Sequence, residues 1–233
     1  MELDPDSLNT RTMYEWMIHS ILPRPIAWVS TVSISGVTNL APFSFFQGVC
    51  ARPPTLMFCP VNHRDGSPKD TLRNIEATGE FVVNTVSATD AEAMNATSAM
   101  LGFEESEFER FGVAAVPSVM VRPVRVASAS VAFECRLDRI IRVSEGPAGG
   151  NIVLGRIVRM HVAKALGRIQ DPEAVGVLVP RLQDSVKAVR EEASTALAAI
   201  GEAALSSLLA ALTHGEWLVR LHAVEALGKT RSS

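Results

Sequence analysis

A repeat with a period near 30 residues sets the last third of this chain apart from the rest. The triplets Ala165-Leu166-Gly167, Ala196-Leu197-Ala198 and Ala226-Leu227-Gly228 occupy equivalent places in a stretch that is rich in alanine and leucine. A repeat of this length, with two amphipathic helices in each unit, is typical of an α-solenoid. The sequence therefore predicts stacked helix pairs over residues 163–233, and a different kind of structure before them.

The chain before residue 163 follows another pattern, in which short β-branched runs alternate with glycine, proline and asparagine. Runs of this kind are typical of strands separated by turns. We expect strands at residues 26–34, 55–59, 80–86, 127–137, 139–144 and 151–162, and helices at 8–19, 70–78 and 89–97. Many short strands with few helices predict a barrel or a sandwich.

Composition and charge argue against several classes of protein. Of the 233 residues 47% are hydrophobic, and the net charge of −3 argues against a broad nucleic-acid-binding surface. No apolar run approaches the roughly 20 residues that span a bilayer, and the acidic start of the chain lacks the apolar stretch of a signal peptide. The separated cysteines Cys50, Cys59 and Cys135 predict neither a zinc site nor a disulfide framework. We therefore expect a cytoplasmic protein with reduced thiols and no metal.

Three segments of the first region could carry chemistry. Residues 24–31 read as a strand that ends in hydroxyl groups, residues 39–46 as a turn beside an aromatic cluster, and residues 69–75 as the start of a helix with a lysine and a threonine. A helix N-terminus with a cation favours a phosphate. An apolar wall with exposed backbone donors suits a flat heteroaromatic ring. Together the three segments suit a phosphorylated flavin.

The motifs R-P-I-A-x-V-S-T, N-x-A-P-F-S-F-F, P-P-T-L-x-F and K-D-T-x-x-N-I occur in this order. Over residues 10–162 the chain resembles the flavin reductase-like, FMN-binding split-barrel family, and four ordered motifs are a specific signal. The resemblance implies a homodimer that binds FMN or FAD near the subunit interface. It also implies hydride transfer from NADH or NADPH to the flavin, which supplies the redox chemistry so that no catalytic acid–base pair is needed.

The resemblance also assigns cofactor-binding residues. It implies that hydroxyl groups hold the flavin ring or ribityl chain, that one turn lines the isoalloxazine, and that a helix start holds the phosphate. The residues are, in that order, Ser30 and Thr31; Asn39, Ala41, Ser44, Phe45 and Phe46; and Lys69 and Thr71. Asp70 is expected to cap the helix that follows. The alternatives are that the phenylalanines are core residues and that Lys69 is a solvated charge.

The second region resembles HEAT repeats of the phycobilisome-lyase type, through the patterns A-L-G-x-I-x-D-P-x-A-V and V-R-x-x-A. We therefore expect an α+β protein of two domains, a split β-barrel at 1–162 and HEAT-like helix pairs at 163–233. The second domain should offer a protein-contact surface, either to the barrel or to a partner. Asp171 is expected to cap a helix that begins with Pro172.

Residues 158–167 allow two interpretations. They align with residues 219–228 of the repeat, yet residues 151–162 also read as the closing strand of the barrel. We favour a strand as far as Val162, because a barrel without it has an unpaired edge. The helical repeat then replaces a further segment that family members carry after this strand, and residues 113–125 are expected to be irregular.

Single residues outside the motifs receive plain interpretations. His63 and His161 lack a second ligand at a useful spacing and are expected to be ordinary histidines. Trp28 is expected in the core, and Trp217 between repeat helices. Three hypotheses follow for the whole chain: an NAD(P)H-dependent flavin reductase, a flavin-binding module without turnover, and an interaction protein with a degenerate barrel. The sequence leaves FMN or FAD, and NADH or NADPH, open.

Overall fold

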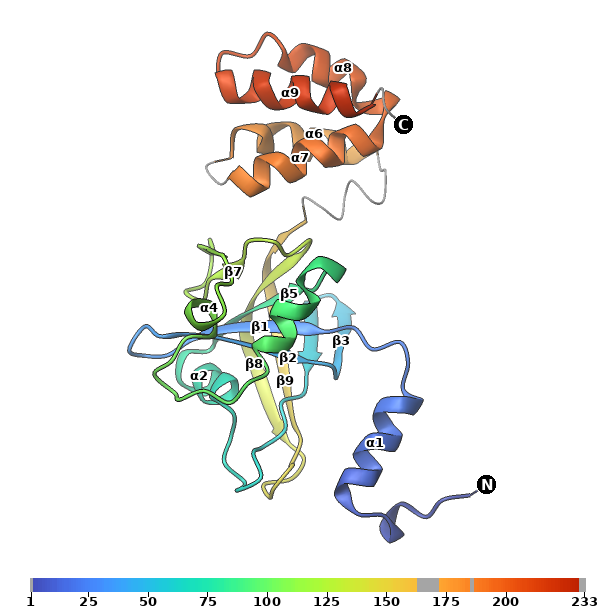
Figure 1. Ribbon diagram of the computed structural model, residues 1–233, viewed down its shortest axis with the longest axis vertical. Helices are drawn as coiled ribbons and strands as arrows, with labels where there is room; N and C mark the ends of the chain where they lie inside the picture. Colours follow the sequence, from blue (N-terminus) through green and yellow to red (C-terminus); the bar gives the residue numbers. More distant parts are fainter. Residues whose placement is uncertain (1, 163–171, 185–186, 231–233) are drawn as a thin grey trace.

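A computed structural model describes residues 2–162, 172–184 and 187–230. It contains an antiparallel β-structure followed by helices, as expected for an α+β protein (Figure 1). The first region contains η1 (Pro5–Ser7), α1 (Thr10–Ser20), β1 (Ala27–Val32), β2 (Thr38–Phe43), β3 (Phe46–Ala51), β4 (Pro54–Phe58), α2 (Asp70–Thr78), β5 (Glu80–Thr85), η2 (Ala88–Asp90), α3 (Ala91–Ala96), α4 (Glu107–Arg110), β6 (Ala115–Val116), β7 (Arg125–Val126), β8 (Ala132–Arg142) and β9 (Asn151–His161). The second contains η3 (Pro172–Ala174), α6 (Val175–Leu178), η4 (Val179–Gln183), α7 (Lys187–Ile200), α8 (Glu202–Ala211) and α9 (Trp217–Thr230).

Seven strands form one sheet in the order β2-β1-β5-β8-β9-β4-β3, and a short β6–β7 pair lies beside it. The strands β2 and β3 at its two edges follow one another in the sequence, and all the pairings between neighbouring strands are antiparallel. The main core is apolar and lies against α2, which buries Leu72 and Ile75. In this core Gly155 leaves room for Phe81, because a Cβ atom at residue 155 would lie 2.9 Å from the Cε1 carbon of that ring.

The predicted strands at 26–34, 55–59, 80–86 and 151–162 are confirmed as β1, β4, β5 and β9, with ends that differ by a few residues. The strand interpretation of residues 158–162 is therefore correct as far as His161. The run expected at 127–137 begins only at Ala132, and it continues through the expected strand at 139–144 as the single strand β8. The predicted irregular segment 113–125 contains the β6–β7 pair at its ends.

The expectation of one turn over residues 39–46 was wrong. Residues 38–43 form strand β2, and β3 begins at Phe46, so only Ser44 and Phe45 lie between the two strands. Proline at position 42 argued against a strand. It is tolerated here because β2 is an edge strand that pairs with β1 alone, where a missing N–H costs no ladder bond.

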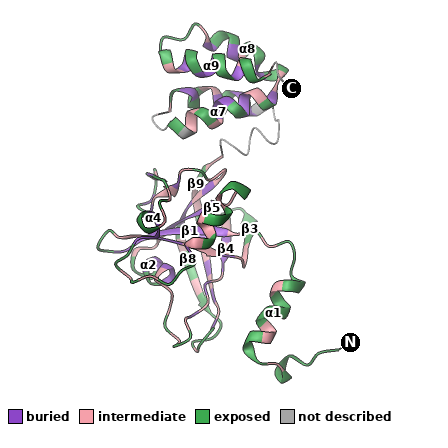
Figure 2. Cartoon of the chain, viewed as in Figure 1, coloured by how far each residue is buried: buried purple, intermediate pink, exposed green. Residues whose placement is uncertain are grey.

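The helix predicted at 70–78 is confirmed with the same bounds, and its C-cap is Gly79 in the left-handed conformation, with φ 69°. The helices predicted at 8–19 and 89–97 are confirmed as α1 and α3, each with shifted ends. Helix α1 contains no buried residue and lies at the outside of the barrel, which it meets through Tyr14 and Phe45 (Figure 2). It exposes apolar side chains such as Trp16 and Met17.

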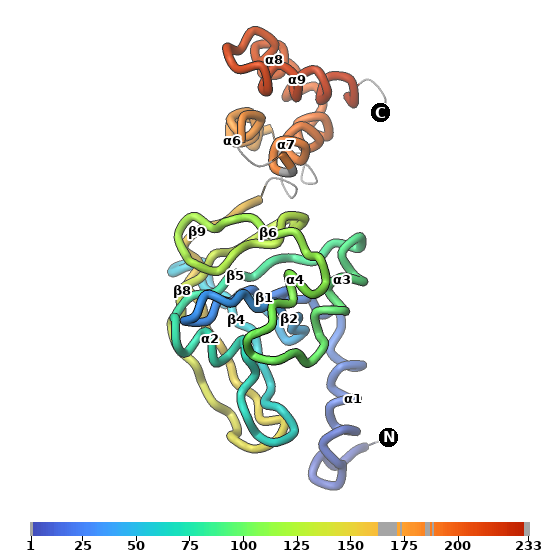
Figure 3. Tube along the Cα trace, turned by 60° about the vertical axis from the view of Figure 1, so that its left-hand side comes forward, coloured from blue at the N-terminus to red at the C-terminus, as the bar shows by residue number. Residues whose placement is uncertain are grey.

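The helices after residue 172 have a separate core made of small and aliphatic side chains. In this core α7 and α9 pack against each other, and α8 packs on α9 (Figure 3). Helical repeats are thus confirmed, although Trp217 is 60% exposed and is not the packing residue that we expected. The first repeat triplet, the expected helix start at Ala163 and the expected cap at Asp171 lie outside the described residues, so the domain boundary at residues 162 and 163 stays a prediction.

Candidate functional site

A cleft of about 1020 Å³ opens on the barrel between β2, the segment that leads into α2, and the segment that joins α3 to α4. Its volume is at the upper end of the range for small-molecule sites. The walls are mixed, with apolar groups from β2 and basic and polar groups around the start of α2. The lining residues are Asn39, Ala41–Phe43, Val61–Asp65, Ser67–Thr71, Arg73, Thr97–Leu101, Phe103 and Glu107.

The start of α2 faces this cleft. Lys69 is the N-cap residue, and its side chain makes no capping hydrogen bond. Asp70 is the first helical residue and pairs with Arg73 at 3.0 Å, so it does not cap the helix as we expected. The first N–H groups of a helix lack intrahelical partners and carry partial positive charge. Together with Lys69 they make this wall suitable for an anion.

A buried polar network supports the β2 wall of the cleft. The side-chain oxygen of Asn39 accepts hydrogen bonds from the hydroxyls of Thr31, at 3.1 Å, and Thr71, at 2.9 Å. Its amide nitrogen donates to both carboxylate oxygens of Glu107, each at 2.9 Å. Asn74 donates to Thr31 in turn. Because every polar atom of Asn39 is satisfied, this side chain is held in one orientation.

Glu107 is the ionisable residue of this network. The residue is buried, and its carboxylate also accepts the N–H of Leu40 at 2.9 Å. Burial raises the pKa of Glu107, and the carboxylate of Asp70 adds to the rise, while the hydrogen bonds from Leu40 and Asn39 oppose it. The network therefore holds an acid whose ionisation is disfavoured beside the cleft.

Four of the nine residues that the sequence predicted for the site line the cleft: Asn39, Ala41, Lys69 and Thr71. Five do not line it: Ser30, Thr31, Ser44, Phe45 and Phe46. Ser30 and Thr31 of β1 are fully buried, and the hydroxyl of Ser30 donates a hydrogen bond to the carbonyl of Val124. The ring of Phe45 meets Tyr14 of α1 edge-on, with the two ring centroids 6.4 Å apart.

Sequence reasoning missed the wall formed by residues 97–103. Trp28 in the core donates its Nε1–H to the hydroxyl of Thr97 at 2.9 Å, which fixes the end of α3 at the cleft. Trp28 is 1% exposed and is the core residue that we expected. Phe103 lies under the guanidinium of Arg73, whose central carbon is 3.8 Å from the ring centroid. Residues 98–103 have no periodic pattern that could have revealed this wall.

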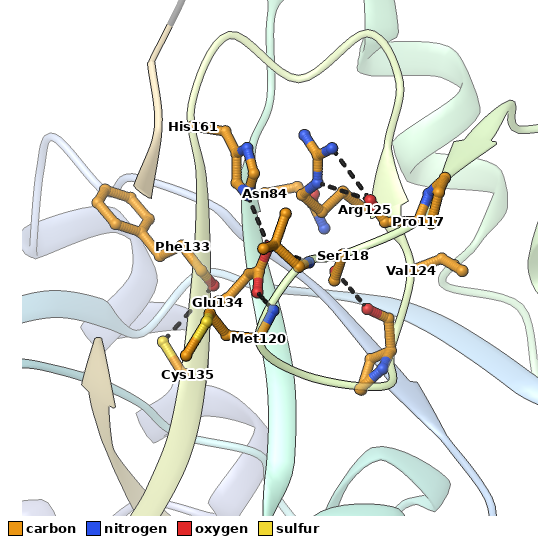
Figure 4. Close-up of polar contacts among 12 residues, drawn as sticks. Asn84, Pro117, Ser118, Met120, Val124, Arg125, Phe133, Glu134, Cys135 and His161 are labelled. Atoms are coloured by element: carbon orange, nitrogen blue, oxygen red, sulfur yellow. Dashed lines mark hydrogen bonds and ion pairs between the residues drawn. The ribbon is translucent and has the colours of Figure 1, made fainter. Parts of the chain in front are cut away.

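A second buried acid lies at another end of the barrel (Figure 4). Glu134 accepts the N–H groups of Val119, at 2.8 Å, and Met120, at 2.6 Å, and its Oε1 lies 2.6 Å from Nε2 of His161. Arg125 beside them donates to the carbonyl of Pro117. The predicted irregular segment is thus tied to the sheet by the carboxylate of Glu134, and also by that of Glu80 in β5, which accepts the N–H of Arg122 at 3.0 Å.

The ionisation of this pair follows from its contacts. Burial raises the pKa of Glu134, but the hydrogen bonds from Val119, His161 and Met120 outweigh it, so the pKa lies below its ordinary value. Burial lowers the pKa of His161, and the guanidinium of Arg125 adds to this effect, although Glu134 opposes it. We infer a neutral imidazole that donates its Nε2–H to a carboxylate.

Within the described residues no group of three or more histidine, cysteine, aspartate or glutamate side chains could hold a metal ion. In the same residues we find no helix with the length and apolar character needed to cross a membrane.

Comparison with known families gives two matches. Residues 18–171 match the flavin reductase like domain. The chain belongs to this family. Residues 156–228 match HEAT repeats, so the two matches overlap at the junction that allows two interpretations in the sequence.

Individual relatives agree with this assignment. The uncharacterized protein BH2278 of Halalkalibacterium halodurans is 40% identical over 168 residues, which are 71% of this chain and 80% of that protein. The structure of nitrilotriacetate monooxygenase component B from Bacillus cereus is 36% identical, with a TM-score of 0.67 over 71% of this chain and 83% of that one. That of 2-nitrobenzoate 2-nitroreductase from Pseudomonas fluorescens is 32% identical, with a TM-score of 0.64 over 71% and 78%. The family and these structures support a flavin oxidoreductase in general terms.

Proposed function

We propose that the barrel binds FMN or FAD in the cleft beside α2 and transfers hydride to it from NADH or NADPH. The observation that carries the proposal is the meeting of a basic helix start with an apolar strand wall in one large cleft, on a chain of the flavin reductase like family. A bound flavin supplies the redox chemistry, and the protein supplies binding and orientation.

The residues around the cleft fit a phosphorylated flavin. Lys69 and the first N–H groups of α2 suit the phosphate, because they combine a cation with unsatisfied donors. Ala41 and Pro42 line the cleft with apolar groups that suit the ring. Asn39 is positioned by Thr31 and Glu107, so its backbone edge on β2 is rigid before any ligand enters.

The five predicted residues outside the cleft receive different parts in this proposal. Ser30 and Thr31 support the cleft without lining it, because their hydroxyls donate hydrogen bonds to Val124 and Asn39. Ser44, Phe45 and Phe46 lie at the turn between β2 and β3, near the exposed α1. We propose that a second copy of the chain covers this turn in a homodimer and brings it to the flavin ring.

The helices after residue 172 are proposed to recruit a protein partner in the cytoplasm. They expose apolar side chains on α8 and α9 outside their own core, namely Leu205, Leu209, Leu221 and Val224. This feature also favours a second candidate function, in which the barrel holds flavin without turnover and the helices recruit a partner.

The test is a flavin titration of the purified full chain, followed by assays of NADH and NADPH oxidation with the flavin supplied. We expect quenching of flavin fluorescence at micromolar protein and steady oxidation of one or both nucleotides. A chain that binds flavin but oxidises neither nucleotide is the non-catalytic module. A colourless chain that fails to bind added FMN rejects both candidates.

A further inference from the structure

A second cleft of about 490 Å³ adjoins the first along the side of α2. Two residues, Arg73 and Phe103, belong to the lining of both clefts, so the two hollows meet at this pair. The rest of the second lining comes from the turn between β1 and β2 and from α2, which contributes the buried Asn74 and the exposed Ala77; the turn contributes Ser33, Ile34 and Ser35. The packing of α2 on β1 and β2 explains why these segments meet.

The chemistry of the second cleft differs from that of the first. Its surface is mainly apolar, with Ile34 78% exposed at the rim and Ala77 exposed on the helix. The hydroxyls of Ser33 and Ser35 lie 2.8 Å apart at its edge. An apolar floor with a few hydroxyls at the edge suits a nucleoside, whose base is flat and whose ribose carries hydroxyl groups.

The pair between the clefts combines a cation with an aromatic ring. The guanidinium of Arg73 lies over the ring of Phe103, and its Nη1 pairs with Asp70 at 3.0 Å. Such a stacked pair offers flat surfaces to an aromatic base. The arginine also adds a cation between Lys69 and the second cleft, where the second phosphate of a dinucleotide would pass.

We propose that the second cleft binds the adenosine half of FAD, while the first binds its flavin half and the start of α2 its diphosphate. This inference rests on the proposed flavin-binding function and names the flavin that the chain prefers. An FMN molecule ends at the phosphate and leaves the second cleft unused. FAD fills both clefts, and so it gains contacts that FMN lacks.

The experiment titrates the full chain with FMN and with FAD and follows flavin fluorescence. The wild type is expected to bind FAD about tenfold more tightly than FMN, since stacking of one base is worth roughly that factor. The variant Ala77→Leu fills the second cleft from a helix position that leucine tolerates well. We expect it to remove the FAD advantage and to change FMN affinity less than twofold, because Ala77 does not line the first cleft.

Two further variants separate a local effect from a general one. Phe103→Leu keeps the apolar volume but removes the ring, and it is expected to weaken FAD more than FMN. Ala210→Leu makes the same change as Ala77→Leu at an exposed alanine of α8, and it is expected to leave both affinities as in the wild type. Unchanged FMN binding in the Ala77 variant also shows that it is folded.

The outcomes distinguish this inference from the function on which it rests. Equal affinity for FMN and FAD in the wild type overturns the inference and leaves the flavin site intact. An equal loss of both affinities in Ala77→Leu also overturns it, as does an FAD advantage that survives the substitution. A wild type that binds neither flavin overturns the proposed function itself.

Discussion

Two nearly identical stretches of this chain adopt different structures. Val158-Arg159-Met160-His161 is the end of strand β9, whereas Val219-Arg220-Leu221-His222 lies in helix α9. In β9 the stretch pairs with β8, and His161 reaches Glu134. In α9 the valine and the histidine are buried three residues apart on the face that packs against α7. The difference teaches that tertiary partners, and not local preference, decide the conformation of this stretch.

The same contrast extends to the two regions as wholes. The barrel encloses polar groups, such as Asn39, Glu107 and Glu134, and these groups hold its loops and its clefts in place. The helical region builds its core mainly from alanine, leucine and valine, and among its described residues the buried polar ones are Ser194 and His222. The first and the second cleft are both lined by barrel residues. We therefore expect substitutions in the barrel to be costly where matched substitutions in the helices are mild.

The largest difference is expected for glycine. Gly155→Ala places a methyl group against the buried ring of Phe81 and should lower the free energy of unfolding by about 3 kcal/mol. Gly228→Ala adds a methyl group in open space on α9 and should raise it by about 0.5 kcal/mol, since alanine favours helix. Urea denaturation followed by circular dichroism measures both. Equal effects would break the comparison between the two regions.

The second-largest difference is expected for the buried carboxylate of Glu134. Glu134→Gln keeps the shape of the side chain but turns one accepting oxygen into a donor that faces an N–H or the imidazole. It should cost about 2 kcal/mol of unfolding free energy. Glu191→Gln, which breaks the exposed pair with Lys187 in α7, should cost less than about 0.5 kcal/mol. Thermal unfolding of the two variants, measured in parallel, provides the test. An equal loss of stability in Glu191→Gln and Glu134→Gln would refute the expected difference.

Lysine substitutions test the cleft. Lys69→Ala removes the cation at the start of α2 and is expected to weaken FMN binding about tenfold, while riboflavin, which has no phosphate, binds as to the wild type. Lys187→Ala on α7 should change neither affinity. Fluorescence titration with the two flavins provides the measurement. A matching loss for riboflavin would place the phosphate elsewhere.

A smaller effect is expected from pH. The pKa of His161 and that of Glu134 both lie below their ordinary values in the folded chain, so the folded state binds fewer protons than the unfolded one. Their contribution to stability is present above those ordinary values and is lost as pH falls. Of the two groups, His161 has the ordinary pKa nearer neutrality, so its contribution to the unfolding free energy should be lost first as the pH falls from 7 towards 5.

The variants His161→Gln and His214→Gln show which histidine causes the change of unfolding free energy with pH, the pH slope. The first is expected to flatten it, because glutamine can still donate to Glu134 but does not titrate. The second changes an exposed histidine of the helical region and should keep the wild-type slope. Denaturant unfolding at several pH values measures the slope. If the wild-type slope persists in His161→Gln, another group causes it.

Much of the fold could be predicted from the sequence, for reasons that differ between the two regions. A period near 30 residues was sufficient for the helices, because their core repeats with it. Alternating β-branched runs were sufficient for β1, β5 and β9. They failed for β2 and β3, because Pro42 and the pair Ser44-Phe45 looked like one long turn. An edge position in the sheet, which made the proline acceptable, is a property of the whole fold.

The candidate site was predicted in part. Lys69, Thr71 and Asn39 carry recognisable polar groups at a helix start and on a strand, so motifs could find them. The opposite wall was not predicted, because Phe103 and most of its neighbours follow the helix expected at 89–97 in a segment that carries no periodic signal. Nor could the sequence show that the hydroxyls of Ser30 and Thr31 donate hydrogen bonds inside the barrel. Whether a hydroxyl faces a ligand or the core depends on packing.

The most direct test of the account is amide hydrogen exchange of the full chain with and without FMN. FMN should slow exchange at β2 and at the start of α2, which border the first cleft, and leave α7, α8 and α9 unchanged. Protection confined to the helical region, or unchanged exchange around Lys69 at saturating FMN, would contradict it.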